Sequence, residues 1–310
     1  MTKNPLVSIV MATYNRAKTI ERAIDGVFKQ SYSNWELIIV DDGSSDNTSE
    51  ILDKYTDSRI RRFKHEKNKG VTATKNLGLK NIKGEWFTTF DSDDEMYPEA
   101  LEVMLNIPLN VDPEVTAVTC NCLDTTTKTF SGLGLKENGY LDNHTLMTVC
   151  KHEFWGITRS DLLQNDLFNE NLFGYESILW YKIDDRAKRY YIHRALRIYH
   201  TEGSDSVTKA QQKYNFEREI SHYSNIIVET HYLEKVKKYN PNEYYHLCKE
   251  GLIVTSAINN KEIAEKYLTF IKDLEPKNHL LPYIYKFRIL AISLIKYKKF
   301  KKFIKNRFLK

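Results

Sequence analysis

The 310-residue sequence lacks any late apolar stretch long enough to cross a membrane. The longest such run, residues 289–295, falls far short of the roughly 20 residues that a membrane-spanning helix needs. Residues 7–12 are apolar but lack the charged n-region and small-residue cleavage site of a secretory leader, so we expect none. The four cysteines form no CxxC pair and no disulfide-like framework. This argues against structural zinc and favours free thiols in a reducing cytoplasm.

Negative charge is missing from the C-terminal end. Residues 286–310 carry ten Lys/Arg and no Asp/Glu, so the +5 of the whole chain leaves −5 (5 − 10) for the first 285 residues. Phe300, Phe303, Ile304 and Phe308 recur at helical spacing, with lysines largely between and opposite them. This pattern is typical of a basic amphipathic helix on an anionic membrane surface. Packing on the protein itself and a nucleic-acid contact remain alternatives, although nothing else in the chain resembles a nucleic-acid-binding module, so we expect no nucleic-acid partner.

The first 125 residues alternate strand and helix patterns. Short strands are predicted at residues 7–11, 36–40, 60–65, 86–90 and 115–120, and helices between them at 19–30, 45–55 and 71–81. Strands separated by helices of this length indicate βαβ units and a mainly parallel sheet. We therefore expect a catalytic domain over residues 1–207, made of halves 1–125 and 126–207, and a helical region over 208–310.

An acidic turn follows the predicted strand at residues 86–90. It reads Asp91, Ser92, Asp93, Asp94. Ligands of open α/β sheets gather at the carboxyl ends of strands. Carboxylates this close repel one another unless a cation joins them, and Mg²⁺ or Mn²⁺ suits oxygen ligands. An acidic turn that caps the helix starting near Pro98 explains the same residues equally well.

Polar residues also follow the first two strands. Tyr14 could stack on a base, and Asp42 could accept a hydrogen bond from a base N–H, although a turn followed by a helix cap explains residues 42–45 without any ligand. Lys69 and Lys75 lie before the acidic turn. They could meet phosphate oxygens or simply line a solvated helix face.

Four ordered motifs together resemble family 2 glycosyltransferases. They are VSIVMATYNR at residues 7–16, ELIIVDDGSSD at 36–46, NLG at 76–78 and DSDD at 91–94. The resemblance is strong over residues 5–105 and weaker over 150–207. It implies a GT-A fold: a Rossmann-like α/β sheet for a nucleotide-diphosphate sugar with helices on both faces, followed by an acceptor half. It also implies inversion at the anomeric carbon.

The resemblance implies a role for individual residues. Thr13, Tyr14 and Asp42 would hold the base, and Asp91 would lie near the ribose. Asp93, the closing acid of the DxD motif, would bind Mn²⁺ or Mg²⁺ with Asp94 as a helper. The complete set around the nucleotide sugar is Thr13, Tyr14, Asn15, Arg16, Asp42, Lys69, Lys75, Asp91 and Ser92.

The second half offers a general base. Glu176 is the only carboxylate of the segment 173–180, where the family usually has an acidic pair opening a helix; here Ser177 follows it. An inverting transfer needs a base to take the proton of the acceptor hydroxyl, and such catalysis contributes on the order of 10²–10⁴-fold. The alternative is a first-turn glutamate that stabilises the helix N-terminus.

Three further residues complete the predicted site. His200 follows a strand-like segment at 196–199, and the resemblance implies that it helps to bind the metal or the diphosphate; a structural histidine is the alternative. Trp155, beside Phe154, and Tyr175 are candidates for contact with the acceptor sugar. Ordinary core packing is the alternative for Phe154 and Trp155.

The predicted function is a metal-dependent, inverting glycosyltransferase. It would move a sugar from a UDP-sugar to a hydroxyl of a cell-surface glycan or lipid-linked acceptor, at the cytoplasmic face of the cell membrane. A nucleotidyltransferase acting on sugar phosphates is one alternative, although residues 13–18 lack the glycine-rich loop it would use. A non-catalytic sugar-nucleotide-binding protein is the other.

Overall fold

A computed structural model describes residues 3–172, 174–201, 216–274, 281–286 and 288–296. The chain divides into two compact units. The first consists of residues 1–170 and 176–210, and the second of 171–175 and 211–310. The second unit thus takes in a short segment just before Glu176, which differs from the continuous division expected at residue 207.

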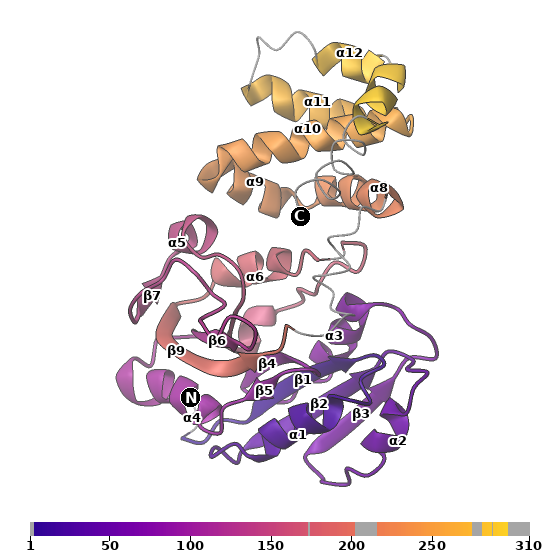
Figure 1. The fold of residues 1–310 in the computed structure, drawn as a ribbon. Helices are drawn as coiled ribbons and strands as arrows, with labels where there is room; N and C mark the ends of the chain where they lie inside the picture. Colours follow the sequence, from indigo (N-terminus) through magenta and orange to yellow (C-terminus); the bar gives the residue numbers. More distant parts are fainter. Residues whose placement is uncertain (1–2, 173, 202–215, 275–280, 287, 297–310) are drawn as a thin grey trace. The chain divides into compact units, whose positions relative to one another are not determined.

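The first unit is built on one mixed sheet with the strand order β3-β2-β1-β4-β8-β6-β9-β5, and β7 beside β9 (Figure 1). The strands are β1 Val7–Thr13, β2 Trp35–Asp41, β3 Ile60–Lys64, β4 Trp86–Asp91, β5 Glu95–Met96, β6 Ala117–Asp124, β7 Gly139–Leu141, β8 Phe154–Arg159 and β9 Arg189–Tyr199. β1 to β4 run parallel, whereas β8 is antiparallel to both of its neighbours, β4 and β6. This arrangement confirms the predicted α/β class.

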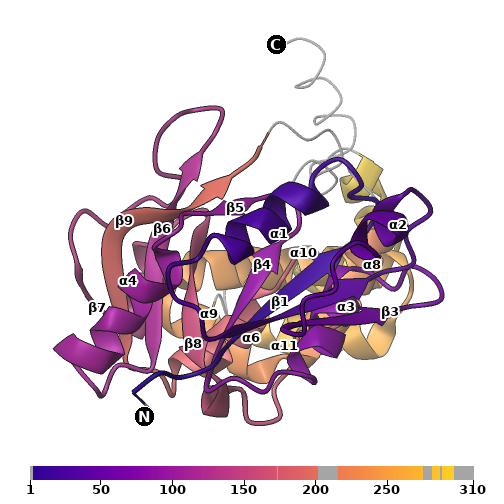
Figure 2. The ribbon, with the colours of Figure 1, turned by 90° about the horizontal axis from the view of Figure 1, so that it is seen from below.

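Helices cover both faces of this sheet (Figure 2). The helices of this unit are α1 Ile20–Phe28, α2 Thr48–Leu52, α3 Val71–Leu79, α4 Ala100–Asn106, α5 Asn143–Thr148 and α6 Ser177–Asp184, with short helical turns at Ile107–Val111 and Ser160–Leu163. β7 and α5 lie within residues 126–150, at the start of the expected second half of the catalytic domain. α2 is shorter than predicted, because the Asp46 carboxylate accepts hydrogen bonds from the backbone and hydroxyl of Thr48.

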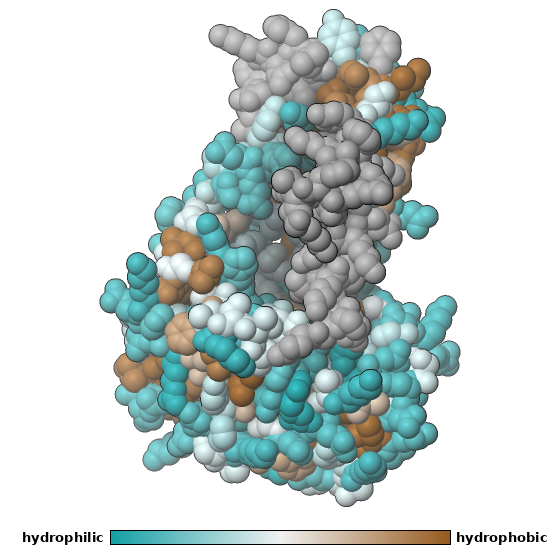
Figure 3. Space-filling view, viewed as in Figure 1, coloured by the Kyte–Doolittle hydropathy of each residue, from teal (hydrophilic) through white to brown (hydrophobic). Residues whose placement is uncertain are grey.

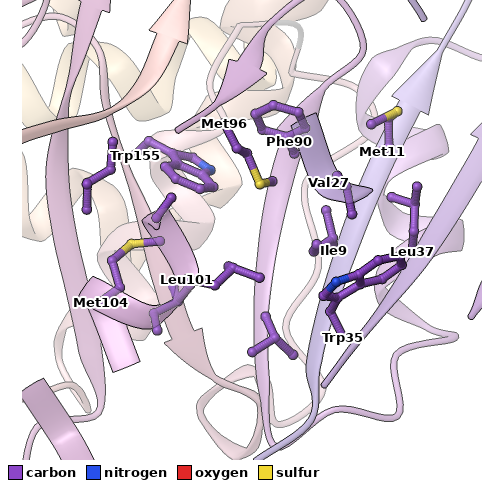
Figure 4. Packing of buried hydrophobic residues seen from close by; sticks show 14 of the residues in the cluster. Ile9, Met11, Val27, Trp35, Leu37, Phe90, Met96, Leu101, Met104 and Trp155 are labelled. Carbon is purple, nitrogen blue, oxygen red and sulfur yellow. The ribbon is translucent and has the colours of Figure 1, made fainter. Parts of the chain in front are cut away.

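Alternation along the buried strands explains the two apolar layers. Ile9 and Met11 of β1 face one cluster with α1 and α4, whereas Val10 faces the other with α3 and α6. Figure 4 shows the first cluster, in which Trp35 and Leu37 pack beside Ile9. Successive side chains of a strand point to opposite faces of the sheet, so one run of apolar residues supplies both layers.

Gly78 brings α3 close to the sheet. A Cβ atom at this position would lie 2.3 Å from Cγ1 of Val10, so a larger residue would displace the helix. Parallel pairing then aligns the strand ends: Thr13 pairs with Asp41, and Ala12 with Asp91. The residues that follow β1, β2 and β4 therefore meet at one edge of the sheet.

The second unit is helical. Its elements are α8 Phe216–Asn225, the turn Ile226–Val228, α9 Thr230–Tyr239, α10 Pro241–Ala257, α11 Lys261–Leu274 and α12 Leu281–Lys286. α10 contacts α8, α9, α11 and α12, so it is the central helix of this unit. Gly251 makes room for the Tyr267 ring, which a Cβ atom there would meet at 2.3 Å. None of the helices that the structure describes is both long and apolar enough to span a lipid bilayer.

Candidate active site

Two buried polar atoms at the ends of β1 and β2 lack hydrogen-bond partners among the described residues. They are Oγ1 of Thr13 and Oδ2 of Asp41. The other Asp41 oxygen accepts hydrogen bonds from the backbone and hydroxyl of Ser44, at 3.0 and 2.6 Å. Lys64 Nζ lies 3.4 Å from Oδ2. Buried polar atoms are nearly always hydrogen-bonded. An acceptor held only by this ion pair and a hydroxyl without a hydrogen-bond partner, on paired residues of β1 and β2, therefore indicate a place for a polar ligand.

Asp42, whose base-binding role stays a prediction, is held by contacts within the protein. It is buried, and its two oxygens accept the backbone N–H groups of Lys69 and Gly70, both at 2.8 Å. The His65 ring nitrogen Nδ1 lies 2.9 Å from Oδ1. Asp42 therefore ties the end of β2 to the loop before α3, and Lys69 enters this contact through its backbone. The oxygen without a hydrogen-bond partner belongs to Asp41, a residue to which the sequence analysis assigned no role.

The turn after β1 links neighbouring loops. Asn15 has a left-handed backbone with φ 53°. Its N–H donates to the Ser44 hydroxyl at 2.9 Å, and its side-chain oxygen accepts from the Ser45 N–H at 2.8 Å. The Arg16 N–H donates to Oγ1 of Thr48 at 2.8 Å. Tyr14, between them and β1, is 41% exposed, so its ring is accessible for stacking.

Asp91 lies between two cations. Lys75 Nζ is 3.4 Å from one of its oxygens, and Nη2 of Arg197 is 2.6 Å from the other. Burial alone would raise the pKa of Asp91, but Lys75 and Arg197 hold it well below its usual range. The Asp91 carboxylate is therefore charged and committed to ion pairs. Neighbouring Ser92 is buried, and its carbonyl accepts a hydrogen bond from the Thr19 hydroxyl.

Asp94 is also committed to protein partners. Its side chain is 1% exposed, and Oδ2 accepts hydrogen bonds from Nε of Arg197, at 2.6 Å, and from Nη2. Oδ1 accepts from the His200 N–H at 2.8 Å. Burial alone would lower the pKa of Arg197, but Asp94 and Asp91 raise it well above its ordinary value. Arg197, which no motif pointed to, thus anchors the acidic turn to β9.

Asp93 is the least compensated carboxylate of the turn. Its Oδ2 lies 3.5 Å from Nη2 of Arg16, a long ion pair, and its side chain is 31% exposed. Burial raises its pKa, as does the neighbouring charge of Asp91. Within the described part of the chain, no group of three or more His, Cys, Asp or Glu side chains is arranged to hold a metal ion. A single carboxylate still fits Mg²⁺ or Mn²⁺, because such ions combine one or two protein carboxylates with substrate phosphates.

His200, the third predicted metal ligand, lies against another acid. Its Nε2 is 2.8 Å from Oε1 of Glu95, which also lies 3.6 Å from Nε of Arg22. His200 and Asp94 both contact protein partners. Of the three predicted metal ligands we therefore retain only Asp93.

Glu176 is the N-cap residue of α6. It lies close enough to Lys75 to affect that ammonium group: burial alone would lower the pKa of Lys75, but Asp91, Glu176 and Glu153 raise it. The structure therefore brings the predicted base to the side of the acidic turn. It also adds Glu153, which the sequence reading missed because no motif surrounds it.

Trp155, a candidate for contact with the acceptor sugar, is buried in the core instead. It is only 5% exposed, its Nε1 donates to the Thr89 carbonyl at 3.1 Å, and its ring packs 5.8 Å from that of Phe90. The reason is topological: β8 lies between β4 and β6, so its inward side chains join the core. Tyr175 belongs to the second unit, where its ring stacks on His222 at 4.2 Å; its acceptor role stays a prediction.

An α/β sheet with a polar carboxyl edge and an acidic turn is the arrangement expected of a nucleotide-sugar transferase. Residues 8–153 match the family described as Glycosyl transferase family 2. The chain is 34% identical over 217 residues to a Campylobacter jejuni protein named GalNAc(5)-diNAcBac-PP-undecaprenol beta-1,3-glucosyltransferase, a match covering 67% of this chain and 69% of that protein. This chain belongs to glycosyltransferase family 2.

A second relative matches over a shorter part of the chain. The Escherichia coli protein named UDP-Glc:alpha-D-GlcNAc-diphosphoundecaprenol beta-1,3-glucosyltransferase WfgD is 41% identical over 104 residues, which cover 34% of this chain and 41% of that protein. The family assignment confirms that the chain is a glycosyltransferase and decides against the nucleotidyltransferase alternative.

Solved structures confirm the GT-A fold. Staphylococcus aureus TarS 1–349, in complex with UDP-GlcNAc, is similar with a TM-score of 0.64 and 18% identity, over 94% of this chain and 91% of that one. The Pyrobaculum calidifontis mannosyltransferase PcManGT, in complex with GDP-Man and Mn²⁺, gives 0.53 and 16%, over 96% and 83%. At such low identity the likeness is one of fold.

Proposed function

We propose that this chain transfers a sugar from a UDP-sugar to a hydroxyl group of a lipid-linked glycan, with inversion at the anomeric carbon. Two relatives are named as glucosyltransferases of undecaprenol-linked diphosphate sugars, and one of these names gives UDP-Glc as donor. One structural neighbour is a complex with UDP-GlcNAc. These names support the class of donor and of acceptor.

The observation that carries the proposal is the pair of atoms without hydrogen-bond partners at the ends of β1 and β2. Asp41 Oδ2 is an acceptor for the single ring N–H of uracil, and the Thr13 hydroxyl can donate to an adjacent uracil carbonyl. Tyr14, exposed at the same strand end, is suited to stack on the ring. The Asp91–Asp94 turn follows the neighbouring strand β4, where the ribose and diphosphate would lie.

Asp93 would hold the divalent cation in this site. When bound, such a cation neutralises the charge that develops on the leaving diphosphate. Lys75 and Arg16, which lie beside Asp91 and Asp93, add fixed positive charge at the same edge. Arg197 and His200 keep Asp94 in place, so the turn presents Asp93 rather than Asp94.

Glu176 would act as the general base. In a single displacement the acceptor oxygen forms a bond to the anomeric carbon while the bond from that carbon to the diphosphate oxygen breaks. The hydroxyl proton passes to the Glu176 carboxylate, and UDP leaves with the electron pair of the broken bond. Attack from the face opposite the leaving group inverts the configuration.

Purified protein can test this function directly. We expect UDP release from one or more UDP-sugars only when Mn²⁺ or Mg²⁺ and an undecaprenyl-diphosphate-linked sugar are both present, with a product longer by one sugar. A panel of UDP- and GDP-sugars serves as the donor control. Transfer from GDP-sugars alone, or full activity in the presence of a chelator, would contradict the proposal.

We also propose a peripheral position on an anionic membrane. Residues 288–296 are helical, and Ile289 and Leu290 are 80% and 37% exposed beside Arg288 and Lys296. Figure 3 shows hydrophobic side chains gathered on part of the surface of the helical unit. The predicted amphipathic pattern at 300–308 lies outside the described residues.

Deletion of residues 296–310 tests this position. It removes eight positive charges, each worth about 1 kcal/mol near an anionic surface. We expect the truncated protein to leave anionic vesicles in co-sedimentation while it keeps its activity on a soluble acceptor. Binding of the full chain should weaken as salt rises, because exposed charges are screened within about 10 Å. Unchanged vesicle binding together with a lower melting temperature would show that the tail packs on the protein instead.

A further inference from the structure

Arg197 joins three elements of the first unit through one buried guanidinium group. Its side chain is 3% exposed. Nε and Nη2 bind Asp94 and Asp91 after β4, while Nη1 lies 3.2 Å from Oε1 of Glu153, just before β8. The guanidinium also lies over the rings of Phe90 and Tyr199, at 5.9 and 5.5 Å. A buried charge is tolerated only when its hydrogen bonds are satisfied, so all three carboxylates matter to its orientation.

The orientation of Arg197 decides which acid of the turn is available. Asp91 and Asp94 are both bound by it, and Asp93 is not. If Arg197 moved, Asp94 would lose its charge partner and the turn could rearrange. Holding Arg197 therefore keeps Asp93 facing outward.

Glu153 is the partner of Arg197 at the edge of this network. Its side chain is 41% exposed, whereas that of Asp94 is 1% exposed. Burial raises the pKa of Glu153 and Arg197 lowers it, while Asp91 and Glu176 raise it further. Glu153 is thus close enough to both Asp91 and Glu176 for their charges to affect it. Glu153 also belongs to a cluster of charged side chains in which carboxylates outnumber cations by one. The carboxylates are Asp91, Asp93, Asp94 and Glu153, and the cations are Arg16, Lys75 and Arg197.

We propose that Glu153 is a positioning residue for the transfer reaction: it holds Arg197 in the orientation that binds Asp91 and Asp94 and thereby leaves Asp93 to the cation and the donor diphosphate. This role rests on the proposed metal-dependent use of a UDP-sugar. Glu153 acts through Arg197 and need not touch either substrate.

Three variants separate position from charge. Glu153→Gln keeps the length and one acceptor oxygen but removes the charge. Glu153→Asp keeps the charge but is one methylene too short to reach Arg197. Glu114→Gln is the matched control, because Glu114 is an exposed glutamate that pairs with Lys188 at 2.8 Å. Calorimetry measures UDP affinity with and without Mn²⁺, and a melting curve follows the fold.

We expect both Glu153 variants to weaken Mn²⁺-dependent UDP affinity by about 10-fold, the usual effect of losing a partner that orients a metal ligand. UDP affinity without Mn²⁺ and the melting temperature should stay near the wild-type values, and Glu114→Gln should change nothing. Wild-type behaviour of Glu153→Asp would overturn the positioning role in favour of charge alone. A lower melting temperature together with weaker UDP affinity, both with and without Mn²⁺, would show that Glu153 has only a structural role.

Failure of the proposed function gives a different result. If wild-type protein bound UDP equally well with and without Mn²⁺, the metal dependence of the proposed function would be contradicted. The positioning role of Glu153 would then be contradicted as well. If wild-type binding needs Mn²⁺ and the Glu153 variants bind normally, only the positioning role is overturned.

Discussion

The two units bury titratable groups in opposite ways. In the first, Asp91 lies between the cations of Lys75 and Arg197, which hold its pKa well below its usual range against the effect of burial, so it stays charged at the edge of the sheet. In the second, the His222 ring stacks on Tyr175 and meets Tyr223 edge-on at 4.6 Å, and its buried Nδ1 has no hydrogen-bond partner among the described residues. Burial alone lowers the pKa of His222 to about 4. Charge is therefore retained where chemistry needs it and suppressed where only packing is at stake.

The largest effect should come from Asp93→Ala. We expect loss of metal-dependent UDP binding and a fall in turnover of about 10³-fold, since a metal supplies several kcal/mol of charge stabilisation. The fold should survive, because Asp93 has only a long ion pair to Arg16. Calorimetry with UDP and Mn²⁺ checks the result.

Asp94→Ala is the matched comparison for that variant. It leaves Arg197 buried without its main partner, which typically costs about 3–5 kcal/mol, so here the melting temperature should fall. Unchanged metal-dependent affinity in Asp93→Ala would remove Asp93 from the metal site.

Glu176→Gln should lower kcat by about 10²-fold or more while donor affinity stays nearly unchanged, as expected for loss of a general base. Steady-state kinetics with varied UDP-sugar separates the two quantities. A variant that keeps most of its kcat would move the role elsewhere. Asp184 is a poor substitute, because it is bound to Arg189 at 2.8 Å.

Asp41→Asn should weaken UDP binding by about 10-fold, because hydrogen bonds to charged groups contribute about 1.5–3 kcal/mol and the amide can present a donor where the base also donates. Titration calorimetry measures the change. Asp42→Asn is the comparison: it disturbs the contacts to Lys69 and Gly70, so its main effect should be on stability. The reverse pattern would restore Asp42 as the base-binding residue.

The smallest effect concerns His222. Its folded-state pKa of about 4 lies below the unfolded value of about 6.5. The unfolded state therefore binds more protons between these values, and stability is lost as pH falls through this window. We expect His222→Phe to remove about 1–2 kcal/mol of the stability difference between pH 7 and pH 5.

Denaturant unfolding at the two pH values measures this difference. His246→Phe, at an exposed position of the same unit, is the control and should leave the pH dependence unchanged. Equal pH dependence in wild type and His222→Phe would contradict the burial of a neutral imidazole.

Much of the first half could be predicted from the sequence. β1, β2 and β4 are short, largely apolar runs bounded by turn residues, and polar residues follow these runs directly. These three strands and their shared edge were therefore accessible to pattern reading. The acceptor half was harder. Trp155 shows the limit, because its exposure depends on β8 lying between two strands that are distant in sequence.

The sequence by itself determined the fold class and the family, since local periodicity and ordered motifs are properties of neighbouring residues. Only the tertiary structure decided which carboxylates of the motifs are bound by other parts of the protein. Asp41 and Asp42 are adjacent, as are Asp93 and Asp94. In each pair one carboxylate accepts hydrogen bonds from distant residues, whereas the other has only a long ion pair with a distant residue, to Lys64 for Asp41 and to Arg16 for Asp93. The partner of Asp94 is Arg197, more than a hundred residues away. Such pairing depends on where the chain returns in space, which no local pattern records.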